Sequence, residues 1–304
     1  MRARLASVWV AAAACLALAY FVLTQRPGPE APPAAQASPA AQATLYDTEV
    51  HRLTSTFAEQ EYRLLVALPR GYAESEARYP ALYVLDADIL FGTITETARL
   101  LTLEGVFVGL QSVPNLILVG IAYPGGFDEM AEKRGRDFTP TTELDSETEI
   151  EPGNTQPDGA DRFFRFLSEQ AIPFIDASYR TARDDRTLIG TSTGGAFILD
   201  TLLCHPGTFQ RYIATSPRMD DILFRHEAAF AQRNQDLNAV LYLSAGTEGE
   251  IEQQIARAVE RFGASLAARG YPRLKLITES LEGENHVSAQ PTAFTHGLKA
   301  VYRN

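Results

Sequence analysis

Short runs of apolar and β-branched residues alternate along the chain with longer stretches in which apolar residues recur every three or four positions. The short runs predict strands that are covered on both faces of a sheet; they lie at 62–68, 81–85, 116–122, 187–189, 212–215, 240–245 and 274–278. The periodic stretches predict amphipathic helices; they lie at 161–178, 194–203, 250–268 and 292–302. Such alternation predicts an α/β fold, with a mostly parallel central sheet and helices on both faces.

The amino-terminal part of the chain does not follow this pattern. Arg2 and Arg4 precede an apolar run at 5–23, and a Pro- and Ala-rich stretch follows at 24–46. We therefore expect a signal peptide or signal anchor at 1–23, a linker at 24–46 and the globular domain at 47–304. The basic residues ahead of the run predict export of the domain. Its location is then periplasmic or at the outer side of the inner membrane, held by a tether through residues 5–23.

Composition narrows the class of protein. Of 304 residues, 45% are hydrophobic and 21% are charged, which is typical of a globular protein. The net charge of −11 opposes binding to nucleic acid, because like charges repel. The two cysteines, Cys15 and Cys204, cannot form a disulfide framework, and we expect Cys204 to be a small buried residue.

The segment 124–159 fits neither a strand nor a helix. It is rich in Gly, Pro and charged residues, and it includes an acidic run at 143–151. A loop of this length in a compact domain is typical of either a lid over a functional site or a solvated insertion, and both interpretations remain open.

A candidate nucleophile lies where a predicted strand meets a predicted helix. Gly190-Thr191-Ser192-Thr193-Gly194 has the G-x-S-x-G pattern of a nucleophile elbow, with a strand before it and a helix after it. The glycines leave room for a sharp turn, and the helix N-terminus favours a developing oxyanion. We therefore predict Ser192 as the nucleophile.

A serine nucleophile needs a base and a residue that orients the base. His286 lies in a turn-forming stretch between the last predicted strand and the last helix, which fits the order serine, acid, histidine. The acid is expected after the strand 240–245, where Glu248, Glu250 and Glu252 compete. Glu248 is preferred because it is nearest the strand end, whereas the other two can serve the first turn of the following helix.

Two backbone amides are expected to stabilise the oxyanion. One is the amide of Thr193, directly after the nucleophile, and the other is the amide of Ala87 or Asp88 after the strand 81–85. Asp86 and Asp88 are not expected to bind a metal, because no histidine or further aspartate accompanies them in the sequence.

Several motifs occur in a fixed order around the elbow: Glu61-Tyr62-Arg63, Leu68-Pro69-Arg70-Gly71-Tyr72, Tyr83-Val84-Leu85-Asp86, Val119-Gly120-Ile121-Ala122-Tyr123, Arg136-Asp137-Phe138-Thr139-Pro140, Gly159-Ala160-Asp161-Arg162-Phe163 and Ser216-Pro217. With them, the sequence from about residue 48 to 303 resembles the putative-esterase (esterase D-like) family of α/β-hydrolases, near its enterochelin-esterase-like branch. The resemblance implies an α/β-hydrolase fold and a serine esterase with Ser192, His286 and a glutamate after Gly246.

The sequence departs from this family at two points. Ala87 replaces a glycine, which matters little if only its amide acts, and Arg218-Met219-Asp220 replaces aromatic residues after Ser216-Pro217. Asp88 and Arg218 are candidate substrate-binding residues. Arg134, Arg136 and Arg218 could steer an anionic substrate, although a solvated surface role is the stronger interpretation for each.

The expected function is hydrolysis of an extracytoplasmic carboxylic ester through an acyl-enzyme, with a siderophore trilactone as a candidate substrate. The expected partner is thus a small-molecule ester, and the chemistry requires no cofactor or metal. An acyltransferase, in which an alcohol replaces water, and a catalytically silent binding module of the same fold are the alternatives.

Overall fold

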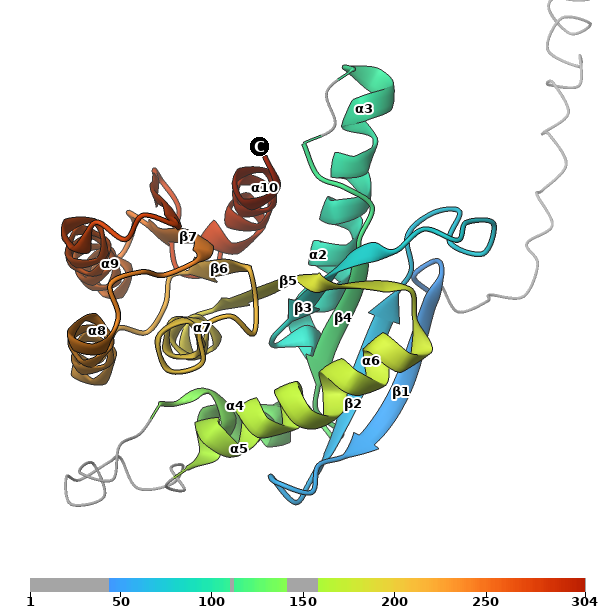
Figure 1. The fold of residues 1–304 in the computed structure, drawn as a ribbon, viewed down its shortest axis with the longest axis horizontal. Coiled ribbons are helices and arrows are strands. Elements are labelled where there is room, and N and C mark those ends of the chain that lie inside the picture. The colour runs from blue at the N-terminus through green and yellow to red at the C-terminus, as the bar shows by residue number, and fades with distance from the viewer. Residues whose placement is uncertain (1–43, 110–111, 141–157, 304) are drawn as a thin grey trace, which may run out of the picture. The chain divides into compact units, whose positions relative to one another are not determined.

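An eight-stranded sheet runs through the domain (Figure 1) in the order β1-β2-β4-β3-β5-β6-β7-β8. The computed structural model describes residues 44–109, 112–140 and 158–303. The strands are β1 (Thr48–Thr54), β2 (Glu61–Ala67), β3 (Tyr79–Val84), β4 (Ile117–Ala122), β5 (Thr181–Thr191), β6 (Arg211–Thr215), β7 (Ala239–Gly246) and β8 (Leu274–Leu281). β2 pairs antiparallel with both β1 and β4, and the other neighbours pair in parallel. The predicted mostly parallel α/β sheet is confirmed.

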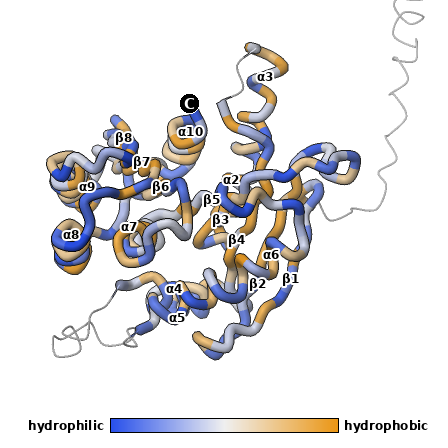
Figure 2. Tube along the Cα trace, viewed as in Figure 1, coloured by the Kyte–Doolittle hydropathy of each residue, from blue (hydrophilic) through white to orange (hydrophobic). Residues whose placement is uncertain are grey.

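Helices cover both faces of this sheet. α2 (Ala87–Thr102) and α10 (Ala289–Tyr302) bury apolar residues against one face, and the short α3 (Glu104–Phe107) follows α2. On the other face lie α4 (Phe127–Phe138), α5 (Gly159–Phe166), α6 (Ile172–Ser178), α7 (Thr193–Cys204), α8 (Asp221–Arg233) and α9 (Glu250–Arg269). Figure 2 shows hydrophobic and hydrophilic residues on different sides of α8 and α9, as expected for helices with one buried face.

The elements that the sequence pattern did not predict include β1 and α4, which bury few residues. β1 is an edge strand whose residues are all exposed or half-buried, so it lacks the apolar run of the central strands. α4 lies inside the segment expected to be a loop, and only Met130, Asp137 and Phe138 in it are buried. That part of the prediction for 124–159 is wrong, and residues 141–157, with the acidic run, lie outside the described residues.

The predicted helix at 161–178 is interrupted. A π-helical segment (Leu167–Ala171) joins α5 to α6, and Pro173 lies in the first turn of α6. Proline has no amide hydrogen, so it cannot bond the carbonyl four residues earlier, and a wider turn at this point accommodates the loss.

The expected burial of Cys204 is wrong. Cys204 is exposed rather than buried, because it ends α7 at the surface.

The apolar run at 5–23 and the linker up to residue 43 lie outside the described residues. Among the helices that the structure describes, none combines the length and apolarity needed to cross a membrane.

Candidate active site

Ser192 lies in a sharp turn between β5 and α7. Its backbone has φ 54° and ψ −122°, in the left-handed half of conformational space that non-glycine residues rarely adopt. A Cβ atom on Gly190 would lie 3.1 Å from the carbonyl carbon of Gly194, and one on Gly195 would lie 2.9 Å from Cβ of Pro217. A side chain at Gly190 or Gly195 would therefore crowd its neighbours, and the nucleophile-elbow geometry expected from the sequence is present.

His286 lies in the loop between β8 and α10 and contacts a buried carboxylate. Its Nδ1 is 2.8 Å from Oε2 of Glu252, a residue that is only 1% exposed. Because the carboxylate accepts a hydrogen bond, the proton of a neutral imidazole is on Nδ1, and Nε2 is left as the basic nitrogen.

Glu252 is held by two further donors. Its Oε1 accepts hydrogen bonds from the hydroxyl of Ser216 and from the amide of Gly246, the latter at 2.6 Å. Burial raises the pKa of Glu252, but the hydrogen bonds from His286, Ser216 and Gly246 outweigh it and lower the pKa below its ordinary value. The carboxylate is therefore ionised at neutral pH and fixed in position.

The preference for Glu248 as the partner of His286 is wrong. Glu248 and Glu250 are both exposed, and only the backbone amide of Glu248 faces the histidine loop, where it donates to the carbonyl of Glu284. Glu252 lies in the first turn of α9 and points inward, on the same buried stripe as Val259, seven residues later. That helical phase was the signal in the sequence, because Glu250 falls on the opposite side of the helix.

The neighbouring parallel strands β5 to β8 bring these residues together at the carboxyl ends of the strands. Ser192 follows β5, Ser216 follows β6, Glu252 follows β7 and His286 follows β8. The amide of Ser192 donates to the carbonyl of Thr215 at 3.1 Å, and Ser216 in turn donates to Glu252. The carboxyl ends of parallel strands are where α/β folds gather ligand-binding groups.

The two expected oxyanion donors begin neighbouring helices. Ala87 is the first residue of α2 and Thr193 is the first residue of α7, so neither amide has a partner within its own helix. The helices start close together, since a Cβ atom on Gly194 would lie 3.2 Å from Oδ2 of Asp86. The N-termini of α2 and α7 therefore lie near one another, next to the turn that carries Ser192.

Arg134 ties the two helix starts to α4, a contact that the sequence analysis missed. Its guanidinium pairs with both carboxylate oxygens of Asp86 at 2.6 and 2.8 Å, and it reaches Oγ1 of Thr193 at 3.4 Å. The Asp86 side chain is 2% exposed. Asp86 has a positive φ of 53°, so this ion pair fixes the strained turn that precedes Ala87.

Comparison with known proteins agrees with this geometry. A family profile described as "Putative esterase" matches residues 55–277. The ferri-bacillibactin esterase BesA of Bacillus subtilis is 30% identical over 273 residues, which cover 84% of this chain and 90% of the relative. The siderophore triacetylfusarinine C esterase of Aspergillus fumigatus is 28% identical over 81% of this chain and 90% of its own length.

The chain belongs to the putative-esterase family. It is a serine ester hydrolase. Its fold is also that of the solved structure of the BES protein from Bacillus cereus, with a TM-score of 0.76 and 24% identity over 89% of this chain and 100% of the other. The resemblance inferred from the sequence motifs is confirmed.

The charged residues expected to bind substrate in this esterase have other contacts. Asp88 accepts hydrogen bonds from Arg63 at 2.7 Å and from the amide of Tyr123 at 3.0 Å, so it joins α2 to β2 and to the end of β4. Arg136 donates to the buried Asp137 at 2.7 Å. Arg218 keeps a side chain that is 58% exposed and pairs with Asp220 at 3.1 Å, directly after the Ser216-Pro217 turn. Of these three side chains, Arg218 is the most exposed.

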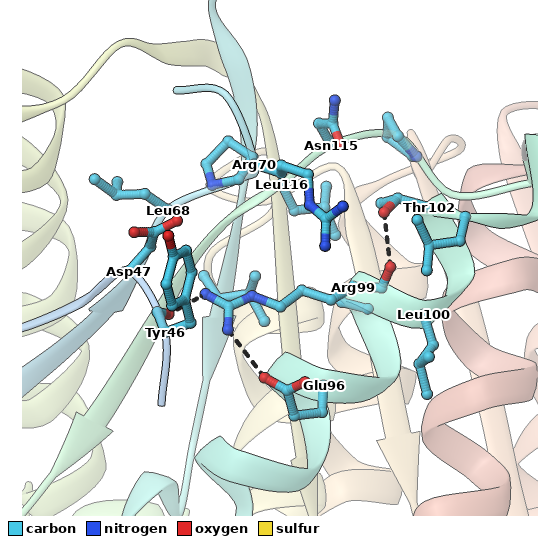
Figure 3. Close-up of a pocket in the computed structure, with 15 residues that line it drawn as sticks. Tyr46, Asp47, Leu68, Arg70, Glu96, Arg99, Leu100, Thr102, Asn115 and Leu116 are labelled. Carbon is cyan, nitrogen blue, oxygen red and sulfur yellow. Dashed lines mark hydrogen bonds and ion pairs between the residues drawn. The ribbon is translucent and has the colours of Figure 1, made fainter. Parts of the chain in front are cut away.

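A cavity of about 400 Å³ lies at the opposite end of the strands, near the start of β4. It is lined by the carboxyl-terminal half of α2, the start of β4 and residues near the end of β2, as Figure 3 shows. Arg99 crosses it and bonds Glu96 at 2.9 Å. Because α2 starts beside the elbow and runs away from it, this cavity is separate from the candidate active site.

Proposed function

We propose that this protein hydrolyses the ester bonds of a siderophore through an acyl-enzyme on Ser192. His286 is the general base, Glu252 orients it, and the amides of Thr193 and Ala87 receive the oxyanion. The hydrogen bond between Nδ1 of His286 and the buried Glu252, at the sheet edge that also carries the Ser192 elbow, is the observation that supports this most strongly.

The reaction follows from the proton positions. Nε2 of His286 takes the proton of Ser192 as its oxygen attacks the ester carbonyl, and the negative charge of Glu252 stabilises the imidazolium. His286 then protonates the departing alkoxide, which leaves an acyl group on Ser192. Water attacks this second ester with the same assistance and releases the carboxylic acid.

The relatives support the substrate class. The Bacillus relative is named a ferri-bacillibactin esterase, and the Aspergillus relative is named a siderophore triacetylfusarinine C esterase. Arg218 is exposed within two residues of the Ser216-Pro217 turn and offers a cation to an anionic siderophore.

We also propose that the reaction takes place outside the cytoplasm. The basic start and the apolar run at 5–23 support export, after which the segment is either cleaved or retained as a tether. Detection of the protein in osmotic-shock or membrane fractions, with or without residues 1–23 by mass spectrometry, tests both points.

The test of the activity compares a catecholate trilactone, a hydroxamate ester siderophore and a short aryl acetate as substrates of the full-length protein. We expect kcat/KM for one of the siderophores to exceed that for the aryl acetate by about tenfold or more, because contacts remote from the ester strengthen transition-state binding. Hydrolysis of the aryl acetate alone would contradict the siderophore assignment and leave the esterase mechanism standing.

The mechanism has its own control. Ser192→Ala is expected to lower kcat by at least about 10⁴-fold, and a fluorophosphonate is expected to label Ser192 in the wild-type protein. A folded wild-type protein that resists labelling would contradict the role of Ser192.

A further inference from the structure

A second group of reactive side chains lies at the other end of α7 from Ser192. Asp200 and Cys204 are one turn apart on this helix, so their side chains share one face. His226 approaches them from α8. Nδ1 of His226 is 2.7 Å from Oδ1 of Asp200 and 3.4 Å from Sγ of Cys204, and Sγ is 3.4 Å from the same Oδ1.

This triangle has nearly the dimensions of one face of a tetrahedral zinc site. With usual bond lengths, sulfur and nitrogen ligands of one Zn²⁺ are about 3.6 Å apart, and nitrogen and oxygen ligands about 3.4 Å. The two sulfur distances agree with these values, and the shorter His226–Asp200 distance needs to widen by roughly 0.7 Å, within the range of side-chain rotation.

The surroundings favour a cation. Burial raises the pKa of the Cys204 thiol, and the negative charges of Asp200 and, less strongly, of Asp161 on α5 raise it as well, against an opposing effect of Arg233. Cys204 is exposed, so an ion can enter from solvent, while Asp200 and His226 are mostly buried and well fixed.

We propose that Asp200, Cys204 and His226 bind a Zn²⁺ ion that joins α7 to α8. A thiolate, an imidazole and a carboxylate suit this ion better than Mg²⁺ or Ca²⁺, which prefer oxygen ligands alone, and water completes the coordination. On binding, the thiol releases its proton to solvent as the sulfur–zinc bond forms, and the imidazole proton moves from Nδ1 to Nε2. α7 is 12 residues long, about 18 Å, which keeps this ion away from the ester bond at Ser192.

Co²⁺ tests the site directly, because it takes the same ligands as Zn²⁺ and gives a thiolate-to-metal absorption band. We expect the full-length protein to bind one Co²⁺ with such a band and to lose the band when Zn²⁺ is added. Cys204→Ser and His226→Gln are expected to abolish the band. The matched controls are Cys15→Ser, which removes the other thiol, and His296→Gln, which removes a histidine paired with Glu279 at 2.8 Å and far from any cysteine in sequence.

Two further measurements keep the test decisive if a variant folds poorly. Zn²⁺ at 100 times its Kd is expected to raise Tm of the wild-type protein by about 5 °C. It is also expected to slow alkylation of Cys204 by about tenfold or more, because the bound thiolate is no longer free to react. Absence of a band together with unchanged alkylation in the folded wild-type protein would overturn the proposal, as would a band that persists in Cys204→Ser.

Discussion

At the scale of single residues, the position of one carboxylate decides the electrostatics of the active site. Glu252 is buried and accepts hydrogen bonds from His286, Ser216 and Gly246, whereas Glu248 is exposed four residues earlier. Sequence reasoning predicted Ser192 as the nucleophile and His286 as its base, but it preferred Glu248 over Glu252 as the partner of His286, because distance from a strand end does not say which way a side chain points.

The two glutamates give a matched pair of variants. Glu252→Gln is expected to lower kcat by about 10³ to 10⁴-fold, because the histidine loses the charge that selects its tautomer and stabilises the imidazolium. Glu248→Gln is expected to change kcat by less than about twofold, since an exposed charge contributes little. Steady-state hydrolysis of an aryl acetate measures kcat of both variants. Equal losses of kcat would refute the role of Glu252 as the residue that orients His286.

The lowered pKa of Glu252 also predicts a pH dependence of stability. Between the pKa of Glu252 in the folded protein and its higher pKa in the unfolded chain, the unfolded chain binds more protons. The contribution of Glu252 to the free energy of unfolding is therefore complete above the unfolded pKa. It is lost as the pH falls through the folded pKa. We expect the free energy of unfolding of wild type to decline relative to Glu252→Gln from pH 7 to about pH 3. Urea unfolding at several pH values measures the difference in the free energy of unfolding between the two proteins. A difference that does not vary with pH would contradict the prediction.

At the scale of elements, the turn between β5 and α7 depends on close contact with the turn after β6. A Cβ atom on Gly195 would come within 2.9 Å of Pro217, which is rigid and follows the positive-φ residue Ser216. Sequence spacing predicted this elbow because the glycine pattern reflects the steric demand of the turn itself.

Gly195→Ala is therefore expected to lower the free energy of unfolding by about 1–3 kcal/mol and to lower kcat as the turn shifts. Gly92→Ala is the control: it lies inside α2 with its nearest neighbour, Leu45, 4.0 Å from the added Cβ. It is expected to be neutral or to stabilise by up to about 1 kcal/mol, because alanine favours a helix more than glycine does. Urea unfolding compares the two, and similar losses would show that the elbow is not the cause.

At the scale of the whole molecule, the described domain carries every group proposed to act on the ester. Leu45–Asn304 forms one compact unit, and both layers of helices pack against its sheet. The apolar run and linker ahead of it supply none of these groups.

We expect a protein of residues 44–304 to fold and to hydrolyse an aryl acetate with kcat/KM within about twofold of the full chain, because domains with their own core fold independently. Thermal unfolding and initial rates test this. A truncated protein that folds but has lost most of its activity would show that the amino-terminal segment contributes to the site.

The sequence by itself determined the alternation of strands and helices, the elbow at Ser192 and the histidine loop at His286. These are local properties, since hydrophobic period reports burial and glycine spacing reports a steric requirement. Only the tertiary structure decided that Glu252 faces His286, that Arg134 pairs with Asp86 and that His226 meets Asp200 and Cys204. Those contacts join residues on different elements, and their choice depends on where each helix starts and which way it turns its side chains across the sheet.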